Sequence, residues 1–185
     1  SKGGAIVYCT STAGLEWKKF KREQNKVVHA KTWEEVQDLT KKLAANAPST
    51  FAYMYSKRCL SQFICEQSVE FAKMGIRMNN VLPGSTDTGM KQEFQDMVGG
   101  EEALIAEAGL AGRLATSEEM AAPMVFLNSD MASFISGLDM VVDYTDTCLK
   151  ILGKKKNLEA VSATNPIICA LAKKMMNKSK NALNA

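Results

Sequence analysis

The sequence predicts an α/β fold in which helices flank a parallel β-sheet. Residues 5–9 and 76–82 are short apolar stretches with the composition of buried strands. The chain between them includes a long helical pattern at 51–74, which is enough for a crossover connection. A strand, a helix and a second strand joined in this way form a parallel pair. Because ligands bind outside the carboxyl ends of such strands, we expect the functional residues at those ends.

The first predicted strand, 5–9, ends in a turn of small and hydroxylated residues at 10–14. Ser11 lies near the start of this turn, which places its hydroxyl at the carboxyl end of the strand. Taken alone, such a serine is more simply explained as a turn residue. A functional role for Ser11 therefore depends on the residues around it.

Residues 15–49 form a polar and charged insertion before the long helix. Within it, Thr32 and Glu35 have the spacing of a capping box. A helix from Trp33 to about Asn46 follows this signal. We expect the insertion to be a solvated flap, and the alternative is a subunit contact or a lid over the substrate.

The long helix at 51–74 carries Tyr53 and Lys57, which are four residues apart and therefore share one face. An ammonium beside a phenol stabilises the phenolate, so we expect Lys57 to lower the pKa of Tyr53 from about 10 toward neutrality. A tyrosine of this kind is a usable general acid/base at cellular pH. Tyr55 is a competing phenol, but no lysine follows it four residues later.

The second predicted strand, 76–82, ends in a Pro-Gly pair. Residues 83–112 then form a loop that contains two short helical patterns, at 88–97 and 100–108. The loop leaves the carboxyl end of a strand, where ligands bind to parallel sheets. We expect it to be mobile and to close over the substrate.

The amino-acid composition changes after residue 153, and this change divides the last part of the chain into two regions. A capping box at 116–119 starts another helix, and the last strand is predicted at 137–143. These elements belong to a main region, 1–153, and the remaining residues, 154–185, form a basic amphipathic tail helix. The tail could bind a membrane surface, but packing against its own subunit or a second one is favoured.

These motifs resemble the carboxyl-terminal part of the short-chain dehydrogenase/reductase family over about 3–143. The insertion and the Pro-Gly-x-Thr-x-Thr run are closest to its 3α-hydroxysteroid dehydrogenase/carbonyl reductase branch. One departure is Asp143-Tyr-Thr145, where the family usually has Asp-Gly-Gly. The matching segments are Ser11–Gly14, Tyr53 with Lys57, Arg77–Asn79, Pro83-Gly84, Thr88, Gly112-Arg113, Ser117–Ala121, Phe126-Leu127, Ser129-Asp130 and Gly137.

The resemblance implies a Rossmann-like doubly wound parallel sheet whose amino-terminal strands are absent from this chain. It implies an oxidoreductase that interconverts a secondary alcohol and a ketone by hydride transfer, with a hydroxysteroid as a candidate substrate. The cofactor would be NAD or NADP, with NAD slightly favoured. Catalysis would fall to Ser11, Tyr53 and Lys57, cofactor binding to Tyr53, Lys57, Pro83, Gly84, Thr86 and Thr88, and the substrate pocket to Thr12, Met90 and Met97.

Some of these residues also fit ordinary structural roles. Thr86 and Thr88 could be simple loop hydroxyls, and most methionines suit a soft core. Met90 and Met97 are the better pocket candidates because they lie in the loop expected to move. His29 is the only histidine, so neither a histidine-based triad nor a multi-histidine metal site can form, and no metal is expected.

The length of 185 residues, 46% of them hydrophobic, is enough for one sizeable core. It is short for the whole fold, which needs about 250 residues. No glycine-rich pyrophosphate turn is present, and the family's catalytic asparagine would lie upstream. We therefore expect a fragment of a longer protein, inactive by itself. The alternative is a non-catalytic or truncated dehydrogenase-like subunit that serves as an interaction module.

The net charge and the cysteine content limit which partners and which cellular compartment the sequence indicates. A net charge of +3 is too small to indicate nucleic-acid binding, and no apolar run is long enough to span a membrane. We expect a small-molecule alcohol or ketone substrate, a homo-oligomer and a cytoplasmic location. Five cysteines without Cys-x-x-Cys spacing predict buried free thiols, namely Cys9, Cys59, Cys65, Cys148 and Cys169.

Overall fold

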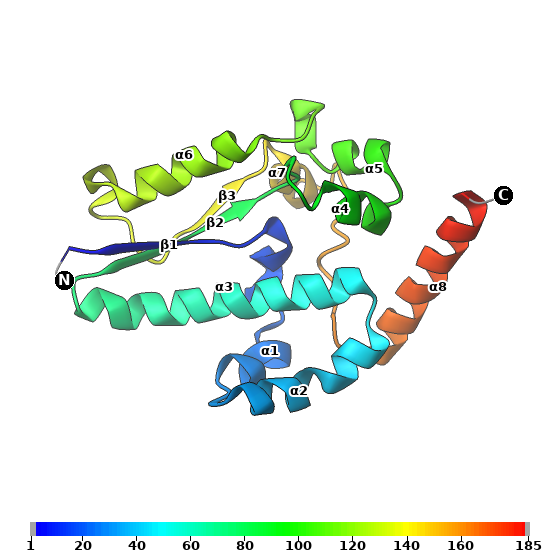
Figure 1. Cartoon of the computed structure of the whole chain (residues 1–185), viewed down its shortest axis with the longest axis horizontal. Helices are drawn as coiled ribbons and strands as arrows, with labels where there is room; N and C mark the ends of the chain where they lie inside the picture. The colour runs from blue at the N-terminus through cyan, green and yellow to red at the C-terminus, as the bar shows by residue number, and fades with distance from the viewer. Residues whose placement is uncertain (1–2, 184–185) are drawn as a thin grey trace.

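The computed structural model of the chain describes residues 3–183 (Figure 1). Its sheet has three parallel strands in the order β1 (Ala5–Cys9), β2 (Arg77–Pro83) and β3 (Asp139–Val142). The predicted α/β fold with a parallel sheet is confirmed. The first strand has the predicted bounds, and the central strand β2 is buried from Met78 to Leu82.

The third strand is shorter than predicted because its first residues bond outside the ladder. Gly137 has a φ of +78° and donates its N–H to the carbonyl of Met78. The N–H of Leu138 donates to the side chain of Asn79, 3.1 Å away. Regular pairing therefore begins only at Asp139.

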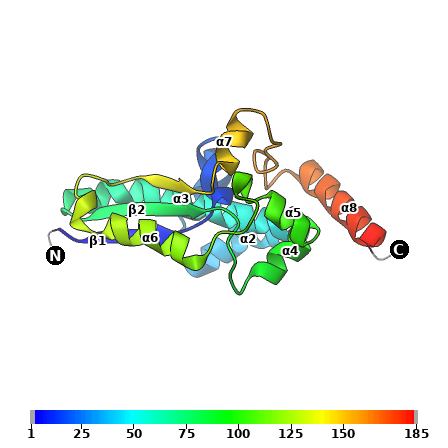
Figure 2. The ribbon, with the colours of Figure 1, turned by 90° about the horizontal axis from the view of Figure 1, so that it is seen from above.

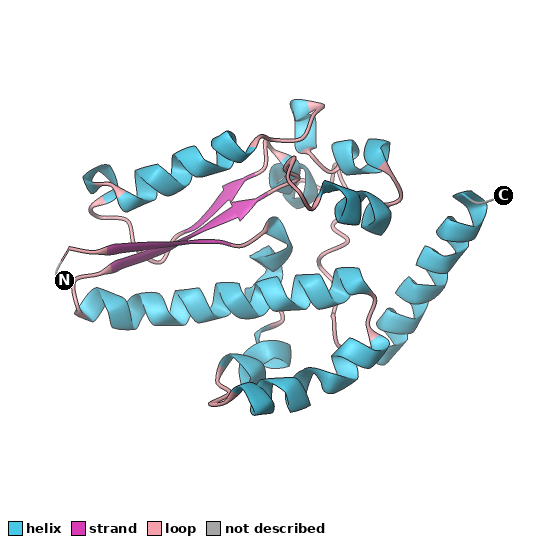
Figure 3. Ribbon diagram, in the orientation of Figure 1, coloured by secondary structure: helices cyan, strands magenta, loops and turns pink. Residues whose placement is uncertain are grey.

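Helices cover both faces of the sheet, as Figures 2 and 3 show. The helix α3 (Ser49–Lys73) packs on one face, and α6 (Ser117–Asn128) packs on the other. A capping box starts α6 as predicted, because Thr116 and Glu119 each accept the other's backbone N–H. Parallel strands covered on both sides in this way expose functional groups mainly at their ends.

The helix α2 (Trp33–Asn46) has the predicted bounds, but its cap is not a reciprocal box. The hydroxyl of Thr32 accepts from the N–H of Glu35, 3.2 Å away. The carboxylate of Glu35 accepts instead from the N–H of Lys31, at 2.7 Å. The carboxylate reaches one residue further back than the motif requires, so only half of the predicted box forms.

Only part of the insertion is a solvated flap. The 3-10 helix η1 (Thr12–Lys18) and the helix α1 (Lys21–Val28) pack against α3, and Trp17 and Gln24 are buried. The amide of Gln24 donates to backbone carbonyls of η1 and α3. By contrast, α2 is largely exposed. The amino-terminal half of the insertion therefore belongs to the body of the protein.

The loop after β2 contains α4 (Lys91–Val98), α5 (Glu101–Ala106) and a 3-10 turn, η2 (Gly109–Ala111). Both predicted helices are present with shifted bounds. Two glycines, Gly99 and Gly100, have positive φ and separate them. The chain thus folds this segment into a compact helical pair rather than an open loop.

The predicted tail is two segments rather than one helix. The strand β3 is followed by α7 (Asp146–Ile151), and residues 154–165 then form an irregular segment, which we call the strap. The strap packs against the body, where Ala163 is fully buried. Only then does α8 (Pro166–Leu183) begin, and it extends away from the body (Figures 1 and 2). The side chains of Lys178 and Lys180 lie outside the described residues.

The connection between α6 and β3 includes the 3-10 turn η3 (Asp130–Ala132). Its Ala132 packs with Val81 and Leu127 in the core on the α6 side of the sheet. No helix within residues 3–183 has the length and apolar character needed to cross a membrane.

All five cysteines are free thiols, but the prediction that they are buried holds only for Cys169, since Cys59 and Cys65 are half-buried. Cys9 and Cys148 are exposed. Cys9 ends an edge strand, and Cys148 lies on the outer side of α7.

Candidate active site

Ser11 and Tyr53 meet at the carboxyl end of β1. The Ser11 side chain lies near enough to the Tyr53 phenol to favour its phenolate form and so lower its pKa. Ser11 also caps η1, because its hydroxyl accepts the N–H of Ala13, 3.2 Å away. The cap fixes the serine side chain, so the turn that follows β1 holds a hydroxyl against the first turns of α3.

A glycine makes this close contact possible. An added Cβ at Gly14 would lie 2.8 Å from the carbonyl oxygen of Lys57 and 2.7 Å from the hydroxyl oxygen of Ser61. Both distances are shorter than any side-chain carbon tolerates. The turn therefore packs backbone to backbone on α3, one helical turn beyond Tyr53.

Lys57 and Tyr53 share a face of α3 as the sequence predicts. The ammonium of Lys57 lies 5.3 Å from the centroid of the Tyr53 ring. The pKa of Tyr53 is nevertheless raised above its ordinary value, chiefly by burial of the phenol. The Ser11 side chain lowers the pKa, while the charges of Cys9 and Glu159 raise it further. The expected fall toward neutrality is wrong, because desolvation outweighs the favourable contacts.

The helix α4 covers the phenol. Phe94 packs edge-on against Tyr53, with ring centroids 5.5 Å apart and an interplanar angle of 84°. The predicted pocket residues Met90 and Met97 flank this contact on the same segment, Met90 exposed and Met97 half-buried. The third, Thr12, is buried within η1. An apolar surface therefore lies beside the phenol.

The predicted cofactor residues lie at the carboxyl end of β2. Gly84 approaches β3 so closely that an added Cβ would be 2.8 Å from the Cβ of Asp143. Thr86 donates its hydroxyl to the carbonyl of Gly84, 3.0 Å away. The exposed Thr88 accepts the N–H of Met90, at 3.3 Å. Thr86 is thus engaged in its own turn, and Thr88 is the more accessible of the two.

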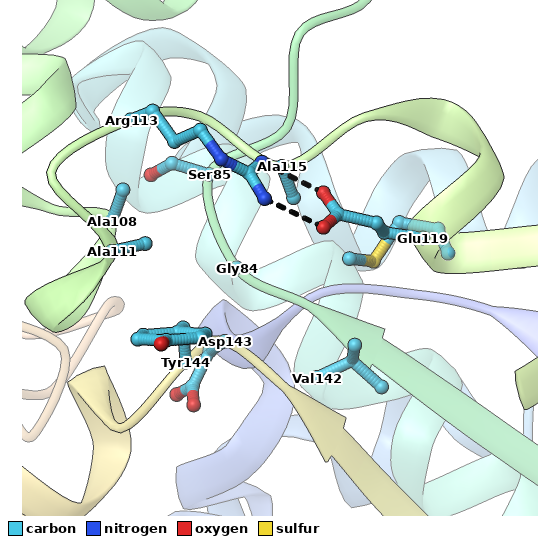
Figure 4. A pocket seen from close by; sticks show the side chains of 11 residues that line it. Gly84, Ser85, Ala108, Ala111, Arg113, Ala115, Glu119, Val142, Asp143 and Tyr144 are labelled. Carbon is cyan, nitrogen blue, oxygen red and sulfur yellow. Dashed lines mark hydrogen bonds and ion pairs between the residues drawn. The ribbon is translucent and has the colours of Figure 1, made fainter.

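A shallow hollow lies beside these residues, between the ends of β2 and β3 and the start of α6 (Figure 4). Among the residues that line it, Arg113 and Glu119 form a bidentate ion pair, with distances of 2.8 and 2.7 Å. At about 100 Å³ it is too small for a drug-sized ligand, which needs at least about 300 Å³. Of the predicted site residues it includes only Gly84, so the arrangement around Tyr53 is the stronger candidate.

Sequence reasoning missed a polar network beneath the site. Thr10 donates to the amide oxygen of Asn80, and the Asn80 amide donates to Asp139, at 2.8 and 2.9 Å. The indole of Trp17 donates to the same carboxylate, 3.1 Å away. The network ties β1, β2, β3 and η1 together directly below Ser11. An asparagine inside an apolar strand was the available signal, since a buried amide needs partners.

Among the described residues, no group of three or more His, Cys, Asp or Glu side chains could hold a metal ion. The site is therefore built from a phenol, a hydroxyl and an ammonium.

Comparison with known proteins assigns the family. Residues 38–144 match a family model described as enoyl-(acyl carrier protein) reductase, which covers more than half of the chain. The chain belongs to the short-chain dehydrogenase/reductase family. This confirms the resemblance; the hydroxysteroid branch stays a prediction.

Relatives within this family carry dehydrogenase names. The chain is 38% identical to a cyclopentanol dehydrogenase of Comamonas testosteroni over 52% of its own length and 38% of the relative's. It is 31% identical to a coniferyl-alcohol dehydrogenase of a Pseudomonas species over 76% and 54% of the two lengths. The chain thus spans about half or less of the length of these curated relatives.

Solved structures agree on the fold. A short-chain dehydrogenase family protein from Francisella tularensis is 27% identical, with a TM-score of 0.55 that covers 80% of this chain and 52% of that one. A structure described as ElxO with bound NADP is 23% identical, with a TM-score of 0.53 over 78% and 47% of the two chains. Both support the Rossmann-like architecture of this dehydrogenase family member.

Proposed function

We propose that the full-length protein is a nicotinamide-dependent oxidoreductase that interconverts a secondary alcohol and a ketone. The observation that carries this proposal is the placement of Lys57 against the Tyr53 ring, with the Ser11 side chain near enough to the phenol to lower its pKa, at the carboxyl edge of a parallel sheet. The names of the relatives, among them cyclopentanol and cyclohexanol dehydrogenases, support an alcohol substrate.

Each residue has a role that its position allows. The Ser11 hydroxyl donates a hydrogen bond to the substrate oxygen, and the Tyr53 phenol exchanges a proton with that same oxygen. Burial keeps the phenol protonated near neutral pH because it raises the pKa. Tyr53 therefore acts as a general acid in ketone reduction, and alcohol oxidation needs the phenolate form, which higher pH favours.

The residues at this edge also fit a nicotinamide cofactor, which supplies the hydride acceptor when bound. Lys57 is half-exposed, and no carboxylate among the described residues lies within ion-pairing distance of it. Its ammonium is thus available to ribose hydroxyls. Pro83 and Gly84 present main chain at the strand end, and Thr88 adds an accessible hydroxyl. The preference between NAD and NADP belongs to residues outside this site.

We propose an alicyclic secondary alcohol as the substrate. The ring of Phe94 and the side chains of Met90 and Met97 give the segment over Tyr53 an apolar character. Cyclopentanol, cyclohexanol and hydroxysteroids share a secondary hydroxyl on an apolar ring. Such a ring would pack on α4 while its hydroxyl reaches Ser11. A cytoplasmic location and a homo-oligomer remain part of the proposal.

The test begins with fluorescence titrations of NADH and NADPH on the full-length protein. A panel of cyclopentanol, cyclohexanol, coniferyl alcohol and a hydroxysteroid then follows, with turnover measured as reduced cofactor. We expect cofactor binding and oxidation of at least one alicyclic alcohol. Binding without turnover would contradict the substrate class. Neither binding nor turnover would favour the alternative, a non-catalytic subunit that serves as an interaction module.

A further inference from the structure

The helices α4 and α5 form one unit that covers Tyr53. Lys91 at the start of α4 pairs with Glu101 at the start of α5, with 2.9 Å between the charged atoms. Phe94 of α4 rests edge-on against the Tyr53 ring. Figure 1 shows α4 near the amino-terminal turns of α3, with α5 next to α4. Any movement of this unit therefore changes the space above the phenol.

The far end of this unit is held by a residue from the strap. The ammonium of Lys155 donates to the carbonyl of Ala106, the last residue of α5, at 2.9 Å. It pairs with the Glu107 carboxylate at 3.2 Å and also contacts Asp146 of α7. Three acceptors from two distant segments thus converge on one ammonium, whose side chain is 20% exposed.

Lys155 is itself fixed in place. Its backbone N–H donates to the carbonyl of Leu149, 3.1 Å away, which ties the start of the strap to α7. Lys150 bridges Asp146 and Glu159, at 2.7 and 3.1 Å, and its side chain is only 7% exposed. Partly buried charges arranged in this way are screened little by water and are costly to separate.

The other end of the strap is attached to the helix that carries the phenol. The guanidinium of Arg58 donates to the carbonyls of Glu159 and Val161, the latter at 3.0 Å. Arg58 is fully buried and stacks over Phe20, 4.2 Å from the ring centroid. The strap therefore joins α3 on one side to the α4–α5 unit on the other.

We propose that Lys155 is a positioning residue that holds the α4–α5 unit over Tyr53, so that the strap sets how far the substrate side of the site can open. The effect of Lys155 on substrate binding rests on the proposed alcohol dehydrogenase function. Its effect on the position of the α4–α5 unit does not, because that effect concerns only the contacts of Lys155. Loss of the ammonium removes the partner of the Glu107 carboxylate and the Ala106 carbonyl and so loosens the end of α5, while Asp146 keeps its pair with Lys150.

Other contacts also hold this region, because Leu104 of α5 and Ala108 just beyond it are buried. The N–H of Leu110 donates to the carbonyl of Tyr144, at 3.2 Å, and Gly109 packs against the same turn. This backbone contact lies beyond α5 and would serve as the hinge about which the unit moves. If such contacts held the α4–α5 unit in place without Lys155, removal of the Lys155 charge would not loosen the unit. Amide hydrogen exchange can measure that outcome.

The test compares Lys155→Met with Lys156→Met in the full-length protein. Lys156 is the adjacent, exposed lysine, so the control removes the same charge from the same segment. Hydrogen–deuterium exchange is followed for residues 91–106. We expect exchange there to be at least about tenfold faster in Lys155→Met, with α3 and α6 unchanged, and no change in the control. Equal exchange in the two variants would overturn the proposal.

A milder variant covers the case in which Lys155→Met unfolds the chain. Glu107→Gln keeps the size of the side chain and removes one charge at the end of α5, where that side chain is 38% exposed. We expect exchange in residues 91–106 to rise about two- to threefold, with an unchanged melting temperature. An unchanged exchange rate in Glu107→Gln together with a globally unstable Lys155→Met would assign Lys155 to general stability and overturn the proposal.

Kinetics then test the consequence for the site. In Lys155→Met we expect the KM for alcohols to rise several-fold with little change in kcat. The reason is that the α4–α5 unit contributes to substrate binding rather than to proton transfer. An unchanged KM with faster exchange would overturn the link to the substrate. If no alcohol is oxidised even by the wild type, the proposed function fails, while the exchange result still decides the role of Lys155.

Discussion

The Lys57 ammonium rests against the ring of Tyr53, 5.3 Å from its centroid, and the phenol still has a raised pKa. The cause is burial of Tyr53 between α3, the turn at Ser11 and Phe94 of α4. An ammonium near an aromatic ring stabilises the pair through the ring quadrupole as well as through charge. The acid/base behaviour of this phenol therefore depends on its enclosure as much as on the lysine.

Replacement of Tyr53 by Phe should abolish most of the activity without loss of the fold. Proton transfer by a positioned side chain is worth about 10²–10⁴-fold, so we expect kcat for alcohol oxidation to fall about 10³-fold. Cofactor affinity should stay within about threefold, because Lys57 remains. Steady-state kinetics and a fluorescence titration measure the two quantities.

Tyr55→Phe is the matched control for that variant. The Tyr55 hydroxyl donates to the carbonyl of Glu23, 3.2 Å away, and the residue is buried in the core. Its loss should cost about 1 kcal/mol of stability and leave kcat unchanged. A similar drop in kcat for both variants would contradict the assignment of Tyr53.

The pH profile should respond to the groups that set the Tyr53 pKa. The Ser11 side chain favours the phenolate, so Ser11→Ala should raise the pKa and move the alkaline rise of alcohol oxidation to higher pH. Glu159 disfavours the phenolate, so Glu159→Gln should lower the pKa and move the rise to lower pH. Profiles of kcat/KM and the ultraviolet absorbance of tyrosinate both report this shift. Shifts in the same direction would refute the electrostatic account.

Gly14→Ala should separate the serine turn from α3. The new methyl group would meet the Lys57 carbonyl and the Ser61 hydroxyl at less than 3 Å. We expect a loss of about 1–3 kcal/mol in the free energy of unfolding and a fall in kcat, because Ser11 would move away from Tyr53. Chemical denaturation and steady-state kinetics measure the two effects.

Gly89→Ala is the control, since an added Cβ there meets nothing within 4 Å. Gly89 lies in the same carboxyl-edge region, in the loop before α4, and its substitution should leave stability and kcat close to those of the wild type. A loss of similar size in this variant would show that the effect at Gly14 is not one of close packing.

Arg58→Lys should destabilise the protein although it keeps the charge. The planar guanidinium stacks on Phe20 while its Nη2 atom reaches two strap carbonyls, and an ammonium cannot do both. We expect a loss of about 2 kcal/mol, measured by chemical denaturation. Arg22→Lys, on the exposed side of α1, should change stability by less than about 0.5 kcal/mol. Equal stability of the two variants would show that the strap needs no guanidinium.

Local patterns account for the predictions that were confirmed. The bounds of β1 and α2 and the capping box of α6 follow from residues within a few positions of one another. The pairing of Tyr53 with Lys57 also depends only on helical spacing. Predictions that depended on distant contacts failed more often, such as the single tail helix and the burial of Cys9.

The amino-acid sequence determined the order of strands and helices, the helical face shared by Tyr53 and Lys57, and the family, because these follow from spacing along the chain. Only the tertiary structure decided the pKa of Tyr53, the network beneath Ser11 and the course of the strap back to α3 and α5. Burial and long-range polar contacts join residues as far apart as Trp17 and Asp139, which are 122 positions apart, and no periodicity in a sequence encodes which of them will meet.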